Sequence, residues 1–132
     1  TLARLCPDDT ILYVRCDDPR DEHYPALAAM EKELVDFRTR AGRPYRLVPL
    51  PWPKACHDED GRRLPATYAN FLIVNGAVLA PIYRDEKDDE ALAVIARVFP
   101  GREVIAIDCR PLIPQHGSLH CVTMQLPRGV LP

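Results

Sequence analysis

The stretch YANFLIVNGAVLAPIY, residues 68–83, decides the fold of this chain. It contains two apolar runs separated by Asn75-Gly76, and this residue pair tolerates the positive φ angles of a type I′ turn. Residues 68–83 are therefore predicted to form a β-hairpin. The segments on either side of the hairpin show how it extends into a larger unit.

A helix and a strand are predicted directly after the hairpin. Asp85 can cap a helix that ends at Pro100-Gly101, and residues 102–108 form an apolar strand. The helix has one apolar stripe, made of Leu92, Ile95, Ala96 and Phe99. Its acidic first turn, within DEKDDE at 85–90, is interpreted as a solvated helix cap rather than a cation site, because the helix dipole stabilises carboxylates there.

The first half of the chain has a similar order of elements. A buried strand is predicted at 11–16, a helix at about 21–39 and a second strand at 45–51. The helical stripe consists of Leu27, Met30, Leu34 and Phe37. Pro49 and Pro51 lack the amide hydrogen of a central strand, so the later half of this strand is expected either to lie at a sheet edge or to leave the sheet. A polar loop follows, with Trp52 as its anchor against the core.

These two halves form a weak internal repeat of strand, helix, Gly-Arg and strand, with Gly42-Arg43 and Gly101-Arg102 at matching places. The complete unit is strand, strand, helix, strand, and the first copy is expected to lack its opening strand. The predicted class is α/β. Residues 1–132 are expected to be the last part of a longer ring-like protein, with a partial module at about 1–64. Residues 65–132 would hold a complete module and a strand carrying Cys121.

Composition excludes several classes of protein. Apolar residues make up 47% of the 132, enough for a globular core. The net charge of -2 is spread without a basic block, so neither nucleic acid nor a membrane is an expected partner. No run is long enough for a membrane helix. The five cysteines form no CxxC pair, which favours a reducing cytoplasm over a disulfide framework.

Cys121, in GSLHCVTMQ at 117–125, has two interpretations. If this segment is a strand, Cys121 and His120 point to opposite faces, so His120 cannot easily act as its base. His116 could fold back across Gly117 to do so. A cysteine in a β run can be buried core filling or a nucleophile, and residue type alone leaves both open.

The candidate ligands for a metal ion are Cys56, His57, His116, His120 and Cys121. Structural zinc sites bring their ligands in tight pairs, two to four residues apart. Only the interval from His116 to His120 comes near that spacing. The sequence therefore predicts no metal.

Three blocks of the chain, taken together, resemble the C-terminal part of the agmatine deiminase and bacterial peptidyl-arginine deiminase family. These blocks are LPATYANFLIVNGAVLAP at 64–81, PGREVIAIDCRPL at 100–112 and HGSLHCVTMQLP at 116–127. The resemblance implies a five-bladed α/β propeller and the hydrolysis of a guanidinium group without metal or organic cofactor. Cys121 matches the family's nucleophile and Asn70 a residue near the active site. Gly117 matches the last glycine of the loop before the nucleophile.

The resemblance also implies a reaction: agmatine and water give N-carbamoylputrescine and ammonia through a covalent thiouronium on cysteine, in polyamine metabolism. Peptidyl-arginine or free arginine is the alternative substrate. A different class of function, a non-catalytic module with Cys121 in the core, also stays open. The substrate would be a small cationic guanidine, and the full-length parent could form a homo-oligomer.

Two departures from the family bear on these expectations. The family's histidine and guanidinium-binding carboxylates belong to motifs expected upstream of Thr1, so residues 1–132 alone are expected to be inactive and to associate through open edges. Gln115 and His116 stand where many relatives have glycines. Glycine permits backbone conformations that these side chains reach only at a cost.

Overall fold

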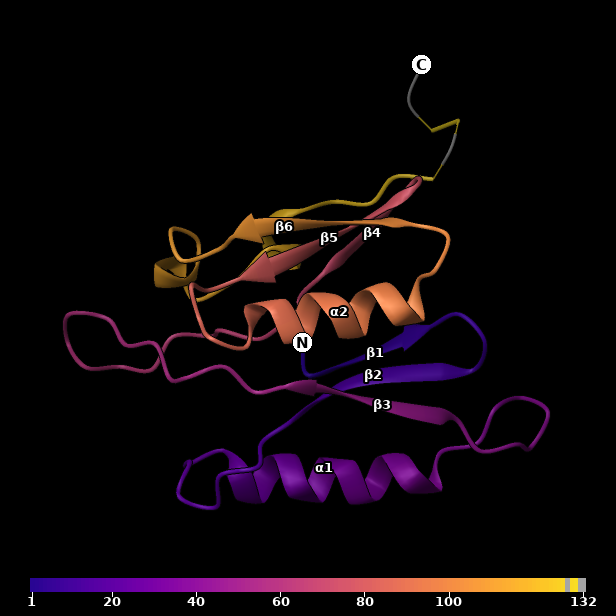
Figure 1. The fold of residues 1–132 in the computed structure, drawn as a ribbon, viewed down its shortest axis with the longest axis horizontal. Coiled ribbons are helices and arrows are strands. Elements are labelled where there is room, and N and C mark those ends of the chain that lie inside the picture. The colour runs from indigo at the N-terminus through magenta and orange to yellow at the C-terminus, as the bar shows by residue number, and fades with distance from the viewer. Residues whose placement is uncertain (128, 131–132) are drawn as a thin grey trace.

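The computed structural model describes residues 1–127, 129 and 130. It contains two successive modules with the same order of elements, strand, strand, helix and strand (Figure 1). The first module consists of β1 (Ala3–Cys6), β2 (Thr10–Arg15), α1 (Tyr24–Asp36) and β3 (Arg46–Pro51). The second consists of β4 (Leu72–Val74), β5 (Ala77–Ile82), α2 (Asp88–Val98) and β6 (Glu103–Asp108). The predicted α/β class and the internal repeat are confirmed.

The first module has its opening strand, so the expectation that this strand was missing is wrong. β1 pairs antiparallel with β2, from Ala3 opposite Tyr13 to Cys6 opposite Thr10. The turn between them places Asp8 and Asp9 at positive φ angles of 56° and 52°. Aspartate tolerates this left-handed region better than most residues. Both modules therefore begin with a hairpin.

The predicted hairpin of the second module is confirmed, with a different turn. Val74 is paired with Ala77, so Asn75 and Gly76 are the two loop residues. Gly76 has a φ of 82°, whereas Asn75 is not among the residues with positive φ. A type I′ turn needs positive φ at both central residues, so the predicted turn type is wrong. A glycine at the second position alone is typical of a type II turn.

Each module forms a three-stranded sheet in which the second strand is central. β2 pairs in parallel with β3, from Thr10 opposite Arg46 to Arg15 opposite Pro51, and β5 pairs in parallel with β6. Among the residues that the structure describes, β3 pairs with β2 alone, which confirms the edge position, one of the two predicted for Pro49 and Pro51. An edge strand tolerates proline because one side of its backbone needs no partner.

The helices cover the sheets differently. α1 packs against β2, whereas α2 packs against β5 and β6 of its own sheet and also against β3 of the first module. Figure 1 shows α2 between the two sheets and α1 on the far side of the first sheet. One core cluster therefore runs through both modules, from Leu12 and Val14 to Ile95 and Phe99.

The predicted apolar stripes are correct in part. α1 buries Leu27 and Leu34, but Phe37 lies after its last turn and is 50% exposed. The buried apolar residues of α2 are Ala91, Val94, Ile95 and Val98. Ala96, predicted to lie in this stripe, is exposed, because the helix contacts two sheets and its buried face turns toward both.

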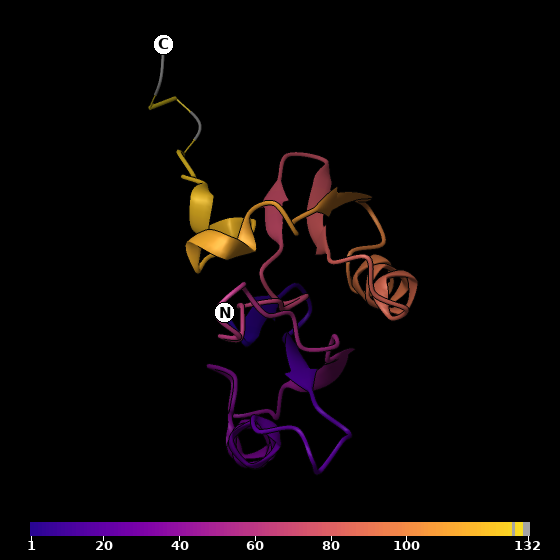
Figure 2. The ribbon, with the colours of Figure 1, turned by 90° about the vertical axis from the view of Figure 1, so that its left-hand side faces the viewer.

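The last part of the described chain contains two short 3₁₀ turns, η1 (Ile113–Gln115) and η2 (His120–Val122). In Figure 2 these turns lie on the side of the second sheet opposite α2. The Gln125 side chain donates a hydrogen bond to the Ile73 carbonyl of β4 at 2.9 Å. None of the helices described is long and apolar enough to span a membrane.

Candidate active site

Cys121 lies in η2, so the predicted strand carrying it is wrong. The amide of Cys121 donates to the Ser118 carbonyl at 3.1 Å, and that of Thr123 donates to the His120 carbonyl at 3.1 Å. These bonds span three residues and define a 3₁₀ turn. The turn leaves Cys121 exposed, so the interpretation of this thiol as buried core filling is also wrong.

The structure brings Asn70 and Cys121 together, as the resemblance implies. The side-chain amide of Asn70 donates to the Cys121 sulfur at 3.4 Å. The Asn70 Oδ1 accepts a hydrogen bond of 2.7 Å from the backbone amide of His120, and the Asn70 carbonyl accepts from the same amide at 3.2 Å. Asn70 is 2% exposed, so one buried side chain holds both the turn and its thiol.

Gly117 lies directly against the thiol. A Cβ atom at this position would be 3.0 Å from the Cys121 Cβ, 3.0 Å from the Gln115 Nε2 and 3.6 Å from the Cys121 sulfur. Its φ is not in the left-handed region, so the position favours glycine for lack of space rather than for its backbone angle. Of the predicted site residues, Cys121, Asn70 and Gly117 therefore form one cluster.

The two residues before Gly117 behave differently from each other. His116 follows η1 in the left-handed conformation, with a φ of 61°. This is the conformation that glycine reaches without strain, so the expected backbone cost at His116 is confirmed. Gln115 is the last residue of η1 and is not among the residues with positive φ.

Hydrogen bonds set the acidity of the Cys121 thiol. The pKa of Cys121 is lowered from its usual value, first by a hydrogen bond with the backbone of Ser118 and then by the Asn70 side chain. Burial, in contrast, raises the pKa of Cys6, Cys56 and Cys109. Because the thiolate is the reactive form of cysteine, Cys121 has the environment of a nucleophile and these three have that of inert thiols.

The candidate ligands Cys56 and His57 do not join this cluster, and His120 contributes its backbone amide. Cys56 and His57 lie in the loop after β3, and His57 forms an isolated bridge with Arg63. Burial lowers the pKa of His120, and its backbone, not its ring, makes the hydrogen bonds of the site. Within residues 1–127, 129 and 130, no group of three or more His, Cys, Asp or Glu side chains could hold a metal ion.

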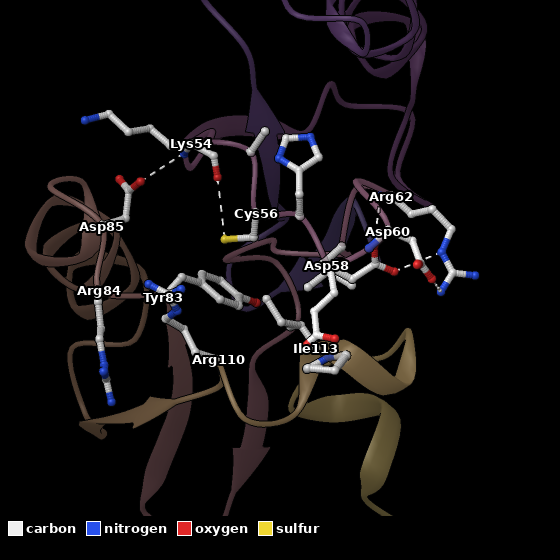
Figure 3. Close-up of a pocket in the computed structure, with 15 residues that line it drawn as sticks. Lys54, Cys56, Asp58, Asp60, Arg62, Tyr83, Arg84, Asp85, Arg110 and Ile113 are labelled. Carbon is white, nitrogen blue, oxygen red and sulfur yellow. Dashed lines mark hydrogen bonds and ion pairs between the residues drawn. The ribbon is translucent and has the colours of Figure 1, made fainter.

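A polar cavity of about 750 Å³ lies elsewhere, beside the loop that follows β3. Figure 3 shows Tyr83 and Ile113 on one side of it and the loop residues Cys56 and Asp58 on the other. Most of its charges are paired, for example Arg62 with Asp58 at 2.9 Å. Cys121 is not among its lining residues. The reactive thiol, and not this cavity, therefore marks the candidate site.

Comparison with known proteins agrees with this arrangement. The sequence model of the Porphyromonas-type peptidyl-arginine deiminase family matches residues 1–127. The chain belongs to this family. Among curated relatives, the agmatine deiminases of Pseudomonas fluorescens and Pseudomonas putida are 33% and 35% identical to this deiminase-family chain, over 89% and 91% of its length.

Solved structures of the deiminases have the same fold. A Porphyromonas gingivalis protein provisionally named arginine deiminase superimposes with a TM-score of 0.94 at 62% identity, over 98% of this chain and 38% of that one. Campylobacter jejuni agmatine deiminase superimposes with a TM-score of 0.82 at 40% identity, over 92% of this chain and 36% of the other. The chain spans only 36% and 37% of the two Pseudomonas enzymes.

Three further residues support the candidate site and were missed in the sequence. Ser118 begins the turn that ends at Cys121, Tyr83 contacts Ser118, and Asp88 contacts Tyr83. In the sequence, Asp88 is only one of the carboxylates of an acidic helix start, within DEKDDE at 85–90. Their partners lie far away in the sequence, so no local pattern indicates these contacts.

The shifted pKa values predict selective alkylation of this deiminase-family chain. Below its pKa, a thiol reacts with iodoacetamide in proportion to its thiolate fraction. We expect Cys121 to reach half its maximal rate at a lower pH than Cys56, because hydrogen bonds lower one pKa and burial raises the other. Peptide mapping after timed alkylation across a pH series measures both midpoints. Equal midpoints, or a lower one at Cys56, would contradict the assignment.

Replacing Gly117 should strain the thiol turn. In Gly117→Ala the new methyl group meets the Cys121 Cβ, which is attached to the backbone of η2 and cannot rotate away. We expect the free energy of unfolding to fall by about 1–2 kcal/mol, as for other overpacked sites. Gly101→Ala is the matched control, because nothing lies within 4 Å of that position. Urea denaturation compares the two, and an equal effect of both would show that space at Gly117 is not limiting.

Proposed function

We propose that this chain takes part in the hydrolytic deimination of a guanidinium group, with Cys121 as the nucleophile. The observation that carries the proposal is an exposed thiol of lowered pKa held by the buried Asn70, in a chain of the deiminase family. An inert structural thiol would be expected in an apolar setting that raises its pKa. The alternative of a non-catalytic module with Cys121 in its core has no such support.

The chemistry follows from the electronic structure of the substrate. A guanidinium carbon is electrophilic but stabilised by resonance, so attack needs a thiolate. The Cys121 sulfur forms a bond to that carbon, and one nitrogen leaves with an added proton as ammonia. The remaining covalent thiouronium is then attacked by water, which breaks the carbon–sulfur bond, releases the urea product and restores the thiol.

The residues of this chain account for the nucleophile part of the site. The Asn70 amide donates to the sulfur and so favours the thiolate before attack. The resemblance assigns the water-activating histidine and the guanidinium-binding carboxylates to positions outside residues 1–132. Under this proposal the chain by itself releases no ammonia.

Agmatine is the substrate we propose first. The Pseudomonas relatives at 33% and 35% identity and the Campylobacter structure at 40% are named agmatine deiminases. Arginine, free or in a peptide, is the second candidate, because two more similar structures, at 62% and 53% identity, are provisionally named arginine and peptidyl-arginine deiminase. The substrates differ at the end away from the guanidinium group. Agmatine ends in an amine, free arginine carries an α-carboxylate, and peptidyl arginine continues into a peptide chain. Ammonia release by the whole protein from each of the three tests the proposal, and turnover of none would refute it.

The complete architecture we propose is a five-bladed propeller. Two of five similar modules would make up about two fifths of such a domain, near the 36–38% of relatives that the chain spans. The first module has three exposed apolar side chains that a preceding module would cover. They are Leu5, Val35 and Phe37, with exposed fractions of 68%, 57% and 50%. The module boundary near residues 64 and 65 and a homo-oligomer of the whole protein remain part of this proposal.

We also propose a cytoplasmic location. Cys6, Cys16, Cys56, Cys109 and Cys121 are all free thiols in the structure. Unpaired cysteines of this number are typical of a reducing compartment. A reactive thiol in particular depends on such an environment to stay reduced.

A further inference from the structure

The hydroxyl group of Tyr83 joins the two segments that carry Asn70 and Cys121. Tyr83 directly follows β5 and is 2% exposed. Its hydroxyl donates to the Thr67 carbonyl at 3.0 Å and lies 2.8 Å from the Ser118 hydroxyl oxygen. Thr67 precedes Asn70 by three residues, and Ser118 precedes Cys121 by three.

The protons in this link can be assigned from chemistry. A phenol has one proton, and the Thr67 carbonyl can only accept, so the Tyr83 proton points to Thr67. The Ser118 hydroxyl then donates to the Tyr83 oxygen. Burial is the main cause that raises the pKa of Tyr83 to about 12, so the phenol keeps its proton throughout the range in which a thiol titrates.

The two residues that the Tyr83 hydroxyl contacts each begin a turn. The turn that starts at Thr67 ends at Asn70, and the turn that starts at Ser118 ends at Cys121. The Thr67 carbonyl also accepts from the Asn70 amide at 3.2 Å, and the Ser118 carbonyl accepts from the Cys121 amide at 3.1 Å. Ser118 is 1% exposed, so its hydroxyl has no water to replace a lost partner. A shift of either turn start therefore changes the position of Asn70 relative to Cys121.

Tyr83 itself is fixed by its surroundings. Its backbone amide donates to the Asp88 carboxylate at 3.1 Å, and the Tyr68 hydroxyl donates to the same carboxylate oxygen at 2.8 Å. The rings of Tyr68 and Tyr83 pack with centroids 5.6 Å apart. The hydrogen bond to Asp88 thus fixes the Tyr83 backbone, and the contact with Tyr68 fixes its ring. Together they place the Tyr83 hydroxyl at a defined position.

We propose that Tyr83 is a positioning residue for the candidate nucleophile: its hydroxyl clamps the Thr67 and Ser118 turn starts and thereby sets the hydrogen bond from Asn70 to Cys121. This inference rests on the proposed function for the role of Cys121. The geometric part can be tested through thiol reactivity alone. A failure of ammonia release and a failure of this inference are therefore separate results.

The test is Tyr83→Phe, which removes the hydroxyl and keeps the ring. Without the clamp the Ser118 and Asn70 hydrogen bonds to the sulfur weaken, so the thiolate fraction of Cys121 falls. We expect alkylation of Cys121 by iodoacetamide at pH 7 to slow by about 3- to 10-fold, the effect of about one hydrogen bond. The pH midpoint of the reaction should move upward, and Cys56 should react as before.

Tyr68→Phe is the matched control. Tyr68 is as buried as Tyr83, loses the same single hydroxyl and shares the Asp88 partner, but its hydroxyl touches neither Thr67 nor Ser118. We expect this variant to lose stability in urea without a change in the Cys121 midpoint. The inference is overturned if Tyr83→Phe leaves that midpoint unchanged, or if Tyr68→Phe moves it equally.

Ser118→Ala tests the same link from its other end. It removes the second hydroxyl, and the double variant with Tyr83→Phe should slow alkylation no further than either single variant, because both break one connection. Additive slowing would contradict the clamp. This variant also decides the question if Tyr83→Phe does not fold.

Discussion

Cys121→Ala is expected to reduce ammonia release by the whole protein at least about 1,000-fold, because no covalent intermediate can form without the sulfur. The KM for the guanidine substrate should change much less, since groups other than the thiol bind the cation. Initial rates of ammonia release, measured over a series of agmatine and of arginine concentrations, check both the maximal rate and KM. The loss should appear with every substrate that the unchanged protein turns over.

Cys56→Ala is the control for this experiment. Cys56 is half-buried, lines the polar cavity and has a raised pKa because of burial. Its replacement should leave turnover near the level of the unchanged protein. If Cys121→Ala retained more than about a tenth of the original rate, the nucleophile would lie elsewhere and this cluster would be structural.

Asp88→Ala should have the largest effect on stability, a fall in the free energy of unfolding of about 3 kcal/mol. The Asp88 carboxylate accepts from the Tyr68 hydroxyl at 2.8 Å and from the backbone amides of Tyr83 and Asp85, both at 3.1 Å. Removing it leaves a buried phenol and a buried amide without their partner. Urea denaturation monitored by tyrosine fluorescence or circular dichroism measures the change.

Asp89→Ala provides the comparison, because Asp89 is the next residue of α2 and is exposed. Both variants remove one carboxylate from the first turn, so their effects through the helix dipole are similar. We expect Asp89→Ala to change the free energy of unfolding by less than about 0.5 kcal/mol. Equal losses in the two variants would mean that the buried hydrogen bonds of Asp88 contribute little.

The predictions from sequence succeeded where a feature depends on neighbouring residues. The hairpin around Asn75-Gly76 and the buried strand β2 follow from short apolar runs and turn residues. β1 was missed because four residues with Arg4 at their centre do not look like a strand. Arg4 is accommodated by the other module, where it donates to the Phe71 carbonyl at 2.8 Å and lies 4.8 Å from the Phe71 ring.

The candidate site was predictable only through the family resemblance. Val122, Thr123 and Met124 have the composition of a short strand, but the His120 amide, which could pair with a neighbouring strand, donates to Asn70. The acidic start of α2 was interpreted as a solvated cap, yet Asp88 is 9% exposed and bonded to Tyr68. In both cases the deciding partner lies outside the local pattern, so propensity and periodicity contain no information about it.

The contact between Asn70 and Cys121 also has a consequence for how the reactive thiol arises in time. The two residues are 51 positions apart, and Tyr83 and Ser118 are 35 apart. Contacts of this range form only after long loops have closed, which is a late and entropically costly event in folding. A newly synthesised or partly unfolded chain therefore presents Cys121 as an ordinary thiol. Its acidity, and with it its sensitivity to oxidants and alkylating agents, is acquired only when the tertiary structure is complete.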